Sequence, residues 1–288
     1  MASAVLFDSP GPKTVRRHRI YTGLSLVVVL AVLAFVLLRL RDAGQFEYAK
    51  WEPLLTPQYL EALLEGLVDT LKMAFTSIIL AVVAGVLFGV GKLSDHAWLR
   101  WPCWAVVELC RAVPVLLMMV FFFYVARIAG GVANGETGAY WSVVAALTVY
   151  NGAVLAEVFR AGILAVPKGQ SEAGYAIGMR KSQVMSVVLL PQGVKIMLPA
   201  IISQCVVALK DTSLGYAIAA PALSKVGQSI FQQFNNALPT VFVVAVMYIA
   251  VNYVLTLIAT WVQHRLVGER KQLEVGMVGG PAPDKDTV

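Results

Sequence analysis

Apolar and polar stretches alternate along the chain in blocks about as long as a membrane is thick. The apolar blocks cover Ile20 to Leu38 and about 66–91, 104–128, 140–166, 193–214 and 238–262. A helix needs ~20 residues, at about 1.5 Å of rise per residue, to cross a hydrocarbon layer of ~30 Å. The pattern therefore predicts an all-α integral membrane protein with six transmembrane helices.

Basic residues predict how these helices are oriented. Arg16, Arg17 and Arg19 precede the first apolar block, and "QHRLVGERK" follows the last one. Lys and Arg gather in cytoplasmic segments, so both termini are expected in the cytoplasm. The expected order is a cytoplasmic tail (1–19), a first span (20–38), an external segment (39–65), the other spans (66–262) and a cytoplasmic tail (263–288). The polar segment 166–191 then lies on the cytoplasmic side.

Two predicted spans carry an acid and an arginine one helical turn apart. Glu108 precedes Arg111 by three residues, and Glu157 precedes Arg160 by the same spacing. Each pair can neutralise itself on one helix face, which charged groups inside a membrane require. Both pairs are expected in the cytoplasmic half of their spans. They form either an inner gate beside a solute pathway or structural ion pairs that fix helix packing.

A third polar group is expected nearer the outer face, in "ALKDTSLGY". Lys210 and Asp211 are adjacent, so they cannot share one helix face, and the hydroxyls of Thr212 and Ser213 follow. A broken helix end of this kind can hold a charged or zwitterionic solute. A helix end with a lysine that extends to the interface is the alternative. Asn151, deep in another span, can bind a solute or a neighbouring helix.

Composition supports the membrane assignment and gives no indication of nucleic-acid binding, a metal site or a disulfide framework. The chain is 58% hydrophobic and 14% charged, with a mean hydropathy of +0.73 and a net charge of +6. The positive-inside pattern explains that charge without nucleic acid. Cysteines 103, 110 and 205 lack the spacing of a metal site or a disulfide framework, and no metal site is expected.

No catalytic motif is found either. The nearest stretch to an ATP-binding loop is "GVLFGVGKL", which has Val86 where a glycine and Leu93 where a hydroxyl residue is needed. We expect no catalytic residues and no cofactor bound by this chain. The energy for active transport would come from an ion gradient or from a partner protein.

The segment 166–191, "VPKGQSEAGYAIGMRKSQVMSVVLLP", is polar and interrupted by glycines. It predicts a short helix from Glu172 to Ile177, closed by Gly178 in a left-handed conformation. A second helix is expected to start at Ser182 and to be stopped by Pro191. This shape suits docking into a groove of another protein, although such a loop can also be a solvated connector.

The spacing within this segment resembles the cytoplasmic loop signature of ABC importer permeases. That signature is Glu-Ala-Ala, three residues, Gly, nine residues and Ile-x-Leu-Pro. The matching positions here are Glu172, Ala173, Gly174, Gly178, Val188, Leu190 and Pro191, with Gly174 and Val188 as departures. From about Leu64 to Val262, stretches such as "VELCRAVPVLLMMVFFFY" and "ALKDTSL" resemble the polar amino acid branch (histidine, glutamate, glutamine, arginine). The opening "AVLFDSPGPKTVRR" is similar to actinobacterial glutamate-type permeases.

The resemblance implies a five-helix type I importer core with one extra N-terminal helix, in a bacterial cytoplasmic membrane. It implies a second permease subunit of the same or a related chain, an ABC ATPase dimer that holds ATP and Mg, and an extracytoplasmic amino-acid-binding protein. The coupling helix that contacts the ATPase would comprise Lys168, Gly169, Gln170, Glu172, Ala173, Gly174 and Gly178. Glutamate is the expected substrate. The rival hypotheses are an ion-gradient-driven carrier that works alone and a membrane scaffold without transport.

Overall fold

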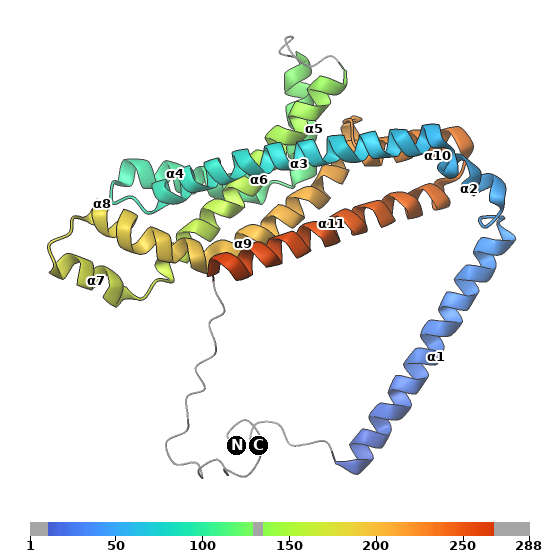
Figure 1. Ribbon diagram of the computed structural model, residues 1–288, viewed down its shortest axis with the longest axis horizontal. Coiled ribbons are helices and arrows are strands. Elements are labelled where there is room, and N and C mark those ends of the chain that lie inside the picture. The colour runs from blue at the N-terminus through green and yellow to red at the C-terminus, as the bar shows by residue number, and fades with distance from the viewer. Residues whose placement is uncertain (1–10, 129–134, 268–288) are drawn as a thin grey trace. The chain divides into compact units, whose positions relative to one another are not determined.

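The computed structural model describes residues 11–128 and 135–267, in which every regular element is a helix (Figure 1). Five helices are long and apolar enough to cross a membrane: Lys13–Asp42, Pro57–Lys92, Glu136–Leu164, Lys181–Ile218 and Ala237–Gln263. The all-helical membrane fold is thus confirmed. The sequence predictions for residues 1–10, for the turn at 129–134 and for residues 268–288 lie outside the described residues.

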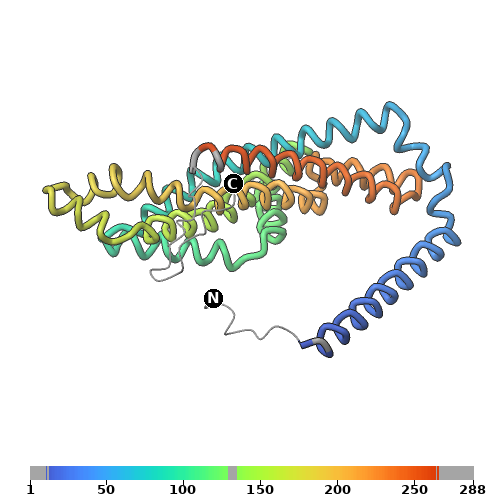
Figure 2. Tube along the Cα trace, turned by 60° about the horizontal axis from the view of Figure 1, so that its bottom comes forward, coloured from blue at the N-terminus to red at the C-terminus, as the bar shows by residue number. Residues whose placement is uncertain are grey.

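A sixth candidate span is broken. Helix α4 (Ala97–Ala112) and helix α5 (Val115–Ile128) meet at an angle of 102°, and both Figure 1 and Figure 2 show the chain turning there. The span expected at 104–128 is therefore a bent pair of helices, and it starts seven residues earlier than predicted. Val113 has an extended conformation because it precedes Pro114, whose ring disfavours helical geometry in the residue before it.

The chain divides into two compact units, and the first comprises residues 1–60 and 229–243. Its helix α1 (Pro12–Asp42) extends beyond the predicted span, and every side chain in 20–38 is exposed. Helix α2 (Tyr48–Leu55) follows. The Asn236 amide donates a hydrogen bond to the Lys50 carbonyl over 2.8 Å, and the rings of Trp51 and Phe242 pack edge to face. These contacts hold α2 to the start of α11 (Ala237–Val267).

The second unit comprises residues 61–228 and 244–288. Helix α6 (Glu136–Leu164) is its most buried helix and packs against α4, α5 and α9 (Leu190–Asp211). Helix α3 (Pro57–Lys92) approaches α6 closely at two glycines. A Cβ on Gly85 would lie 2.7 Å from Leu155 Cβ, and one on Gly89 would lie 3.0 Å from the Ala156 carbonyl oxygen. Small residues therefore set the α3–α6 spacing, as is common in membrane helix packing.

The polar segment after α6 folds as a helix, a turn and a second, longer helix. Helix α7 (Lys168–Ala176) is followed by Gly178 at φ +84°, which confirms the left-handed glycine. Helix α8 (Lys181–Gln183) continues through a π-helix, η2 (Val184–Leu189), directly into α9. Figures 1 and 2 both place this turn at one end of the second unit.

Three local predictions for this segment are wrong. Helix α7 begins at Lys168 and not at Glu172. The second helix is capped by the Gln183 side chain, which accepts a hydrogen bond from the Arg180 N–H over 2.8 Å, and not by Ser182. The helix also continues through Pro191. Pro191 is tolerated because it lies in the first turn of α9, directly after the widened π turn, where its missing N–H costs little.

Candidate functional site

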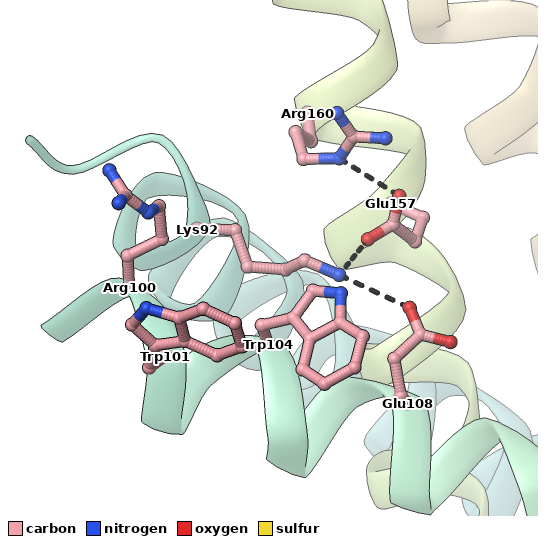
Figure 3. Close-up of a pocket in the computed structure, with 7 residues that line it drawn as sticks. All are labelled: Lys92, Arg100, Trp101, Trp104, Glu108, Glu157 and Arg160. Carbon is pink, nitrogen blue, oxygen red and sulfur yellow. Dashed lines mark hydrogen bonds and ion pairs between the residues drawn. The ribbon is translucent and has the colours of Figure 1, made fainter. Parts of the chain in front are cut away.

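The two predicted ion pairs form and are joined into one charged cluster by Lys92, the last residue of α3. Arg160 Nε lies 3.0 Å from Glu157 Oε2, and Arg111 Nη1 lies 3.4 Å from Glu108 Oε1. The Lys92 ammonium contacts Glu157 and lies 3.4 Å from Glu108 Oε1. Figure 3 shows Lys92 extended between the two carboxylates. One buried cation therefore links α3, α4 and α6.

Lys92 is the member of this cluster that the sequence analysis missed. Its side chain is 4% exposed, whereas those of Glu157 and Glu108 are 20% and 41% exposed. The residue follows the apolar run of α3 and reads as the start of a polar loop, which gave no indication of burial. The two acids on different spans were the available clue, because charged groups inside a membrane normally pair with one another.

A cavity of about 450 Å³ opens beside the charged cluster. It is lined by Lys92, Arg100, Trp101, Trp104, Glu108, Glu157 and Arg160 (Figure 3). The rings of Trp101 and Trp104 pack edge to face with centroids 5.8 Å apart. The lining combines charged groups with large aromatic surfaces, so it can hold water or a polar group between apolar helices.

Helix α7 presents most of its predicted coupling residues to the outside. Residues Lys168, Gly169, Gln170, Glu172, Ala173 and Gly178 are exposed. Gly174 is the buried exception: a Cβ there would lie 3.0 Å from Val184 Cγ2 of η2. The apolar side chains of Tyr175 and Ile177 are 48% and 79% exposed. The helix is thus packed on one side and open to a partner on the other.

An ion pair ties the loop between α3 and α4 to the start of α8. Asp95 contacts Lys181, and the hydrogen bond and charge of that ammonium lower the pKa of the Asp95 carboxyl. The sequence analysis did not identify this pair. Both side chains are exposed, so the pair positions the two segments more than it stabilises the fold.

Asn151 is buried and has partners within the chain. Its amide nitrogen donates to the Leu147 carbonyl over 2.9 Å, and its oxygen accepts a hydrogen bond from Gln204 Nε2 over 2.6 Å. The second bond joins α6 to α9. Of the two roles predicted for Asn151, the structure shows these helix contacts, and Asn151 has no hydrogen bond to residues 210–213.

The helix is irregular after Asp211, as predicted. It narrows into a 3₁₀ helix, η3 (Thr212–Ile218), which ends at Ala219 with φ +54°. Thr212 is fully buried and donates to the Leu209 carbonyl over 2.6 Å. Lys210 is exposed, and no hydrogen bond or ion pair joins the side chain of Lys210 or Asp211 to any described residue. The four residues of the predicted cluster are therefore adjacent in the chain but differ in accessibility.

Comparison with known proteins identifies the family. Residues 77–268 match the family described as the binding-protein-dependent transport system inner membrane component. The chain belongs to this family. The match runs from the middle of α3 to the end of α11, and so it includes the charged cluster, α7 and the irregular end of α9. The resemblance to ABC importer permeases is thereby confirmed.

The relatives are amino acid permeases. The chain is 40% identical to the glutamate transport system permease protein GluD of Corynebacterium glutamicum, over 84% of this chain and 89% of that protein. It is 35% identical to a probable glutamine ABC transporter permease protein, GlnP, of Bacillus subtilis, over 70% of this chain and 92% of that protein. A crystal structure of an amino acid ABC transporter with histidines has a chain with the same fold (TM-score 0.68, 24% identity, 75% and 98% coverage).

These findings place the chain in the cell membrane as the membrane-spanning component of a binding-protein-dependent transporter. The family match extends over the helices that carry the charged cluster and α7. The orientation of the termini, the domain boundaries outside the matched region and the roles of individual site residues stay predictions.

Proposed function

We propose that this chain is the permease subunit of an ATP-driven importer that moves a polar amino acid, glutamate, into the cytoplasm. The observation that carries the proposal is the 40% identity to a glutamate transport permease across 84% of the chain. The charged cluster and the polar end of α9 support it, because a carrier of charged solutes needs charged groups among its spans.

The proposed assembly contains two permease subunits, an ATPase dimer and an extracytoplasmic amino-acid-binding protein. ATP and Mg bind to the ATPase, and this chain binds no cofactor or nucleic acid and catalyses no reaction itself. Both termini lie in the cytoplasm, with α7 on the same side. Movement of the ATPase dimer then reaches the spans through contact with the exposed side of α7.

The connection of α7 to the spans supports this coupling. Gly174 packs against Val184, and the η2 segment that contains Val184 continues without a break into α9. A movement of α7 can therefore be carried along one continuous helix to Lys210 at the end of α9 and on to Ser213 in η3. The charged cluster acts in this proposal as the inner gate, because Lys92 holds α4 and α6 together while the gate is closed.

The coupling proposal is tested by ATPase assembly. Glu172 is exposed on α7, and Glu172→Lys reverses its charge without touching a packed residue. We expect the variant to lose co-purification with the ATPase. Glu61→Lys is the matched control: Glu61 is an exposed acid at the start of α3, on the outer side in the proposed orientation.

The control variant should assemble and transport normally. Normal ATPase binding and uptake by Glu172→Lys contradict the coupling role of α7. Glutamate uptake by the chain alone, driven by a proton gradient, contradicts the proposed function as a whole.

A further inference from the structure

The first turns of α4 carry a row of tryptophans that has no role in the proposed function. Trp98, Trp101 and Trp104 follow one another at intervals of three residues, and all three side chains are exposed. Every residue of 97–102 is exposed. Tryptophan is enriched where a membrane meets water, because its ring is apolar and its indole N–H is polar. The start of α4 therefore has the surface of a segment at the boundary between lipid tails and headgroups.

Helix α4 begins at the same end of the second unit as α7. Asp95, in the loop before α4, contacts Lys181 at the start of α8, and α8 follows α7 after a short turn. This end is cytoplasmic in the proposed orientation. Arg100 lies in the first turn of α4, which begins at Ala97. Its guanidinium is therefore expected near the headgroups of the cytoplasmic leaflet, where anionic lipids give the membrane surface a negative potential.

Arg100 is a cation without an acid partner. Its Nη1 donates a hydrogen bond to the Ser94 carbonyl over 3.3 Å, and no ion pair joins its guanidinium to a described carboxylate. Lys92 and Arg160, the other cations that line the cavity beside the charged cluster, both contact acids. A guanidinium has five N–H donors, so most of those of Arg100 are open to a further acceptor.

This cavity is polarised along α4. Arg100 and Glu108 both line it, and they are eight residues apart, which is about 12 Å of helix rise. Figure 3 shows Arg100 with Trp101 on one side of the cavity and Glu108 on the other. The carboxylates of Glu108 and Glu157 also have their own cationic partners. An anion at the Arg100 end is therefore kept apart from both acids.

The groups at the Arg100 end suit a phosphate that belongs to a lipid. The planar guanidinium can donate to two phosphate oxygens at once. Trp101 and Trp104 add indole N–H groups, and neither forms a hydrogen bond with a described residue. Their exposed rings provide apolar surface for the glycerol and the first part of an acyl chain. A free phosphate ion would use the donors but leave this apolar surface uncovered.

We propose that the Arg100 end of this cavity binds the phosphate of an anionic phospholipid of the cytoplasmic leaflet, with the glycerol and acyl chains over Trp101 and Trp104. Basic pockets at the cytoplasmic ends of membrane helices bind anionic headgroups by the same chemistry. The inference goes beyond the proposed function and takes from it only the orientation of α4. It places a lipid next to the charged cluster.

Photoreactive lipids test this site on the full-length chain in phosphatidylcholine vesicles, with and without the partner ATPase. The vesicles contain a trace of phosphatidylglycerol or of phosphatidylcholine that carries a photoreactive headgroup. Peptide mass spectrometry then measures the labelling of residues 97–104. We define the selectivity as labelling by phosphatidylglycerol divided by labelling by phosphatidylcholine, and we expect a value well above one in the unmodified chain.

Removal of the unpaired cation should reduce the selectivity. We expect a fall of about fivefold in Arg100→Gln, the equivalent of ~1 kcal/mol for one cation at an anionic membrane surface. Arg100→Lys keeps the charge and should retain most of the selectivity. Lys195→Gln is the matched control, because Lys195 is an exposed cation on α9 outside the cavity, and it should leave the selectivity unchanged.

Three results would overturn the lipid site: a selectivity of one in the unmodified chain, an unchanged selectivity in Arg100→Gln, or an equal fall in Lys195→Gln. Inorganic phosphate should displace no more phosphatidylglycerol label than sodium chloride at the same ionic strength. Specific displacement by phosphate would assign the cavity to a free anion and contradict the proposal. Loss of labelling when the ATPase binds would assign α4 to a protein contact, which also contradicts it.

These measurements do not depend on transport. Absence of ATP-dependent uptake by the complete transporter would contradict the proposed function and leave the labelling of α4 as a separate result.

Discussion

Lys92 brings one positive charge to two carboxylates that belong to different helices. Because its side chain is almost fully buried, the cation has left water and depends on Glu108 and Glu157 for its stability. The acids depend on it in turn, since they would otherwise face each other with only their own arginines as partners. At the scale of single residues, the charged cluster is therefore a unit of three helices and not a pair of local ion pairs.

Removal of this cation should be costly. We expect Lys92→Met to lower the free energy of unfolding by roughly 3 kcal/mol, because it removes the buried partner that Glu108 and Glu157 share and leaves each acid with only its own arginine. Lys72→Met is the matched control on the same helix, since Lys72 pairs with Asp69 at 62% exposure, and it should cost less than ~1 kcal/mol. Denaturation of both variants in detergent measures the difference, and equal losses would contradict the structural importance of Lys92.

At the scale of elements, the contact between α7 and η2 depends on a residue without a side chain. Gly174→Leu should force these elements apart and lower stability by about 1–3 kcal/mol, the usual cost of overpacking. Gly169→Leu is the control on the same helix, because a Cβ there meets nothing within 4 Å. Thermal unfolding of the permease without its ATPase separates this packing effect from docking. An unchanged transition in Gly174→Leu would show that α7 does not rest on η2.

The same elements show what the sequence could predict. Apolar block lengths predicted the long helices, and Gly178 predicted the turn after α7 because few other residues adopt positive φ. Pro114 and Pro191 both follow an apolar residue, yet the chain bends at Pro114 and the helix continues through Pro191, so a proline alone did not predict which helix breaks. The Glu108–Arg111 and Glu157–Arg160 ion pairs could be predicted, because each acid and its arginine are one helical turn apart. The role of Lys92 could not, because Lys92 joins residues of α4 and α6 that only the fold brings together.

At the scale of the whole molecule, α1 is separate from the region that matches the family. The match begins at residue 77, and no residue from Lys13 to Asp42 is buried. We expect a chain that begins at Gly44 to retain the ion pairs and the unfolding midpoint of the full chain in detergent. A large fall in the midpoint would show that α1 packs on the permease. A normal midpoint with lost uptake would assign α1 to assembly or insertion.

The central claim is that this chain moves an amino acid only when a partner hydrolyses ATP. Uptake of radiolabelled L-glutamate into proteoliposomes tests it most directly, with the permease, ATPase, binding protein and ATP each omitted in turn. The account predicts uptake only when all four are present, and no uptake by the permease alone under an imposed proton gradient. Gradient-driven uptake by the permease alone, or no uptake by the complete assembly, would contradict it.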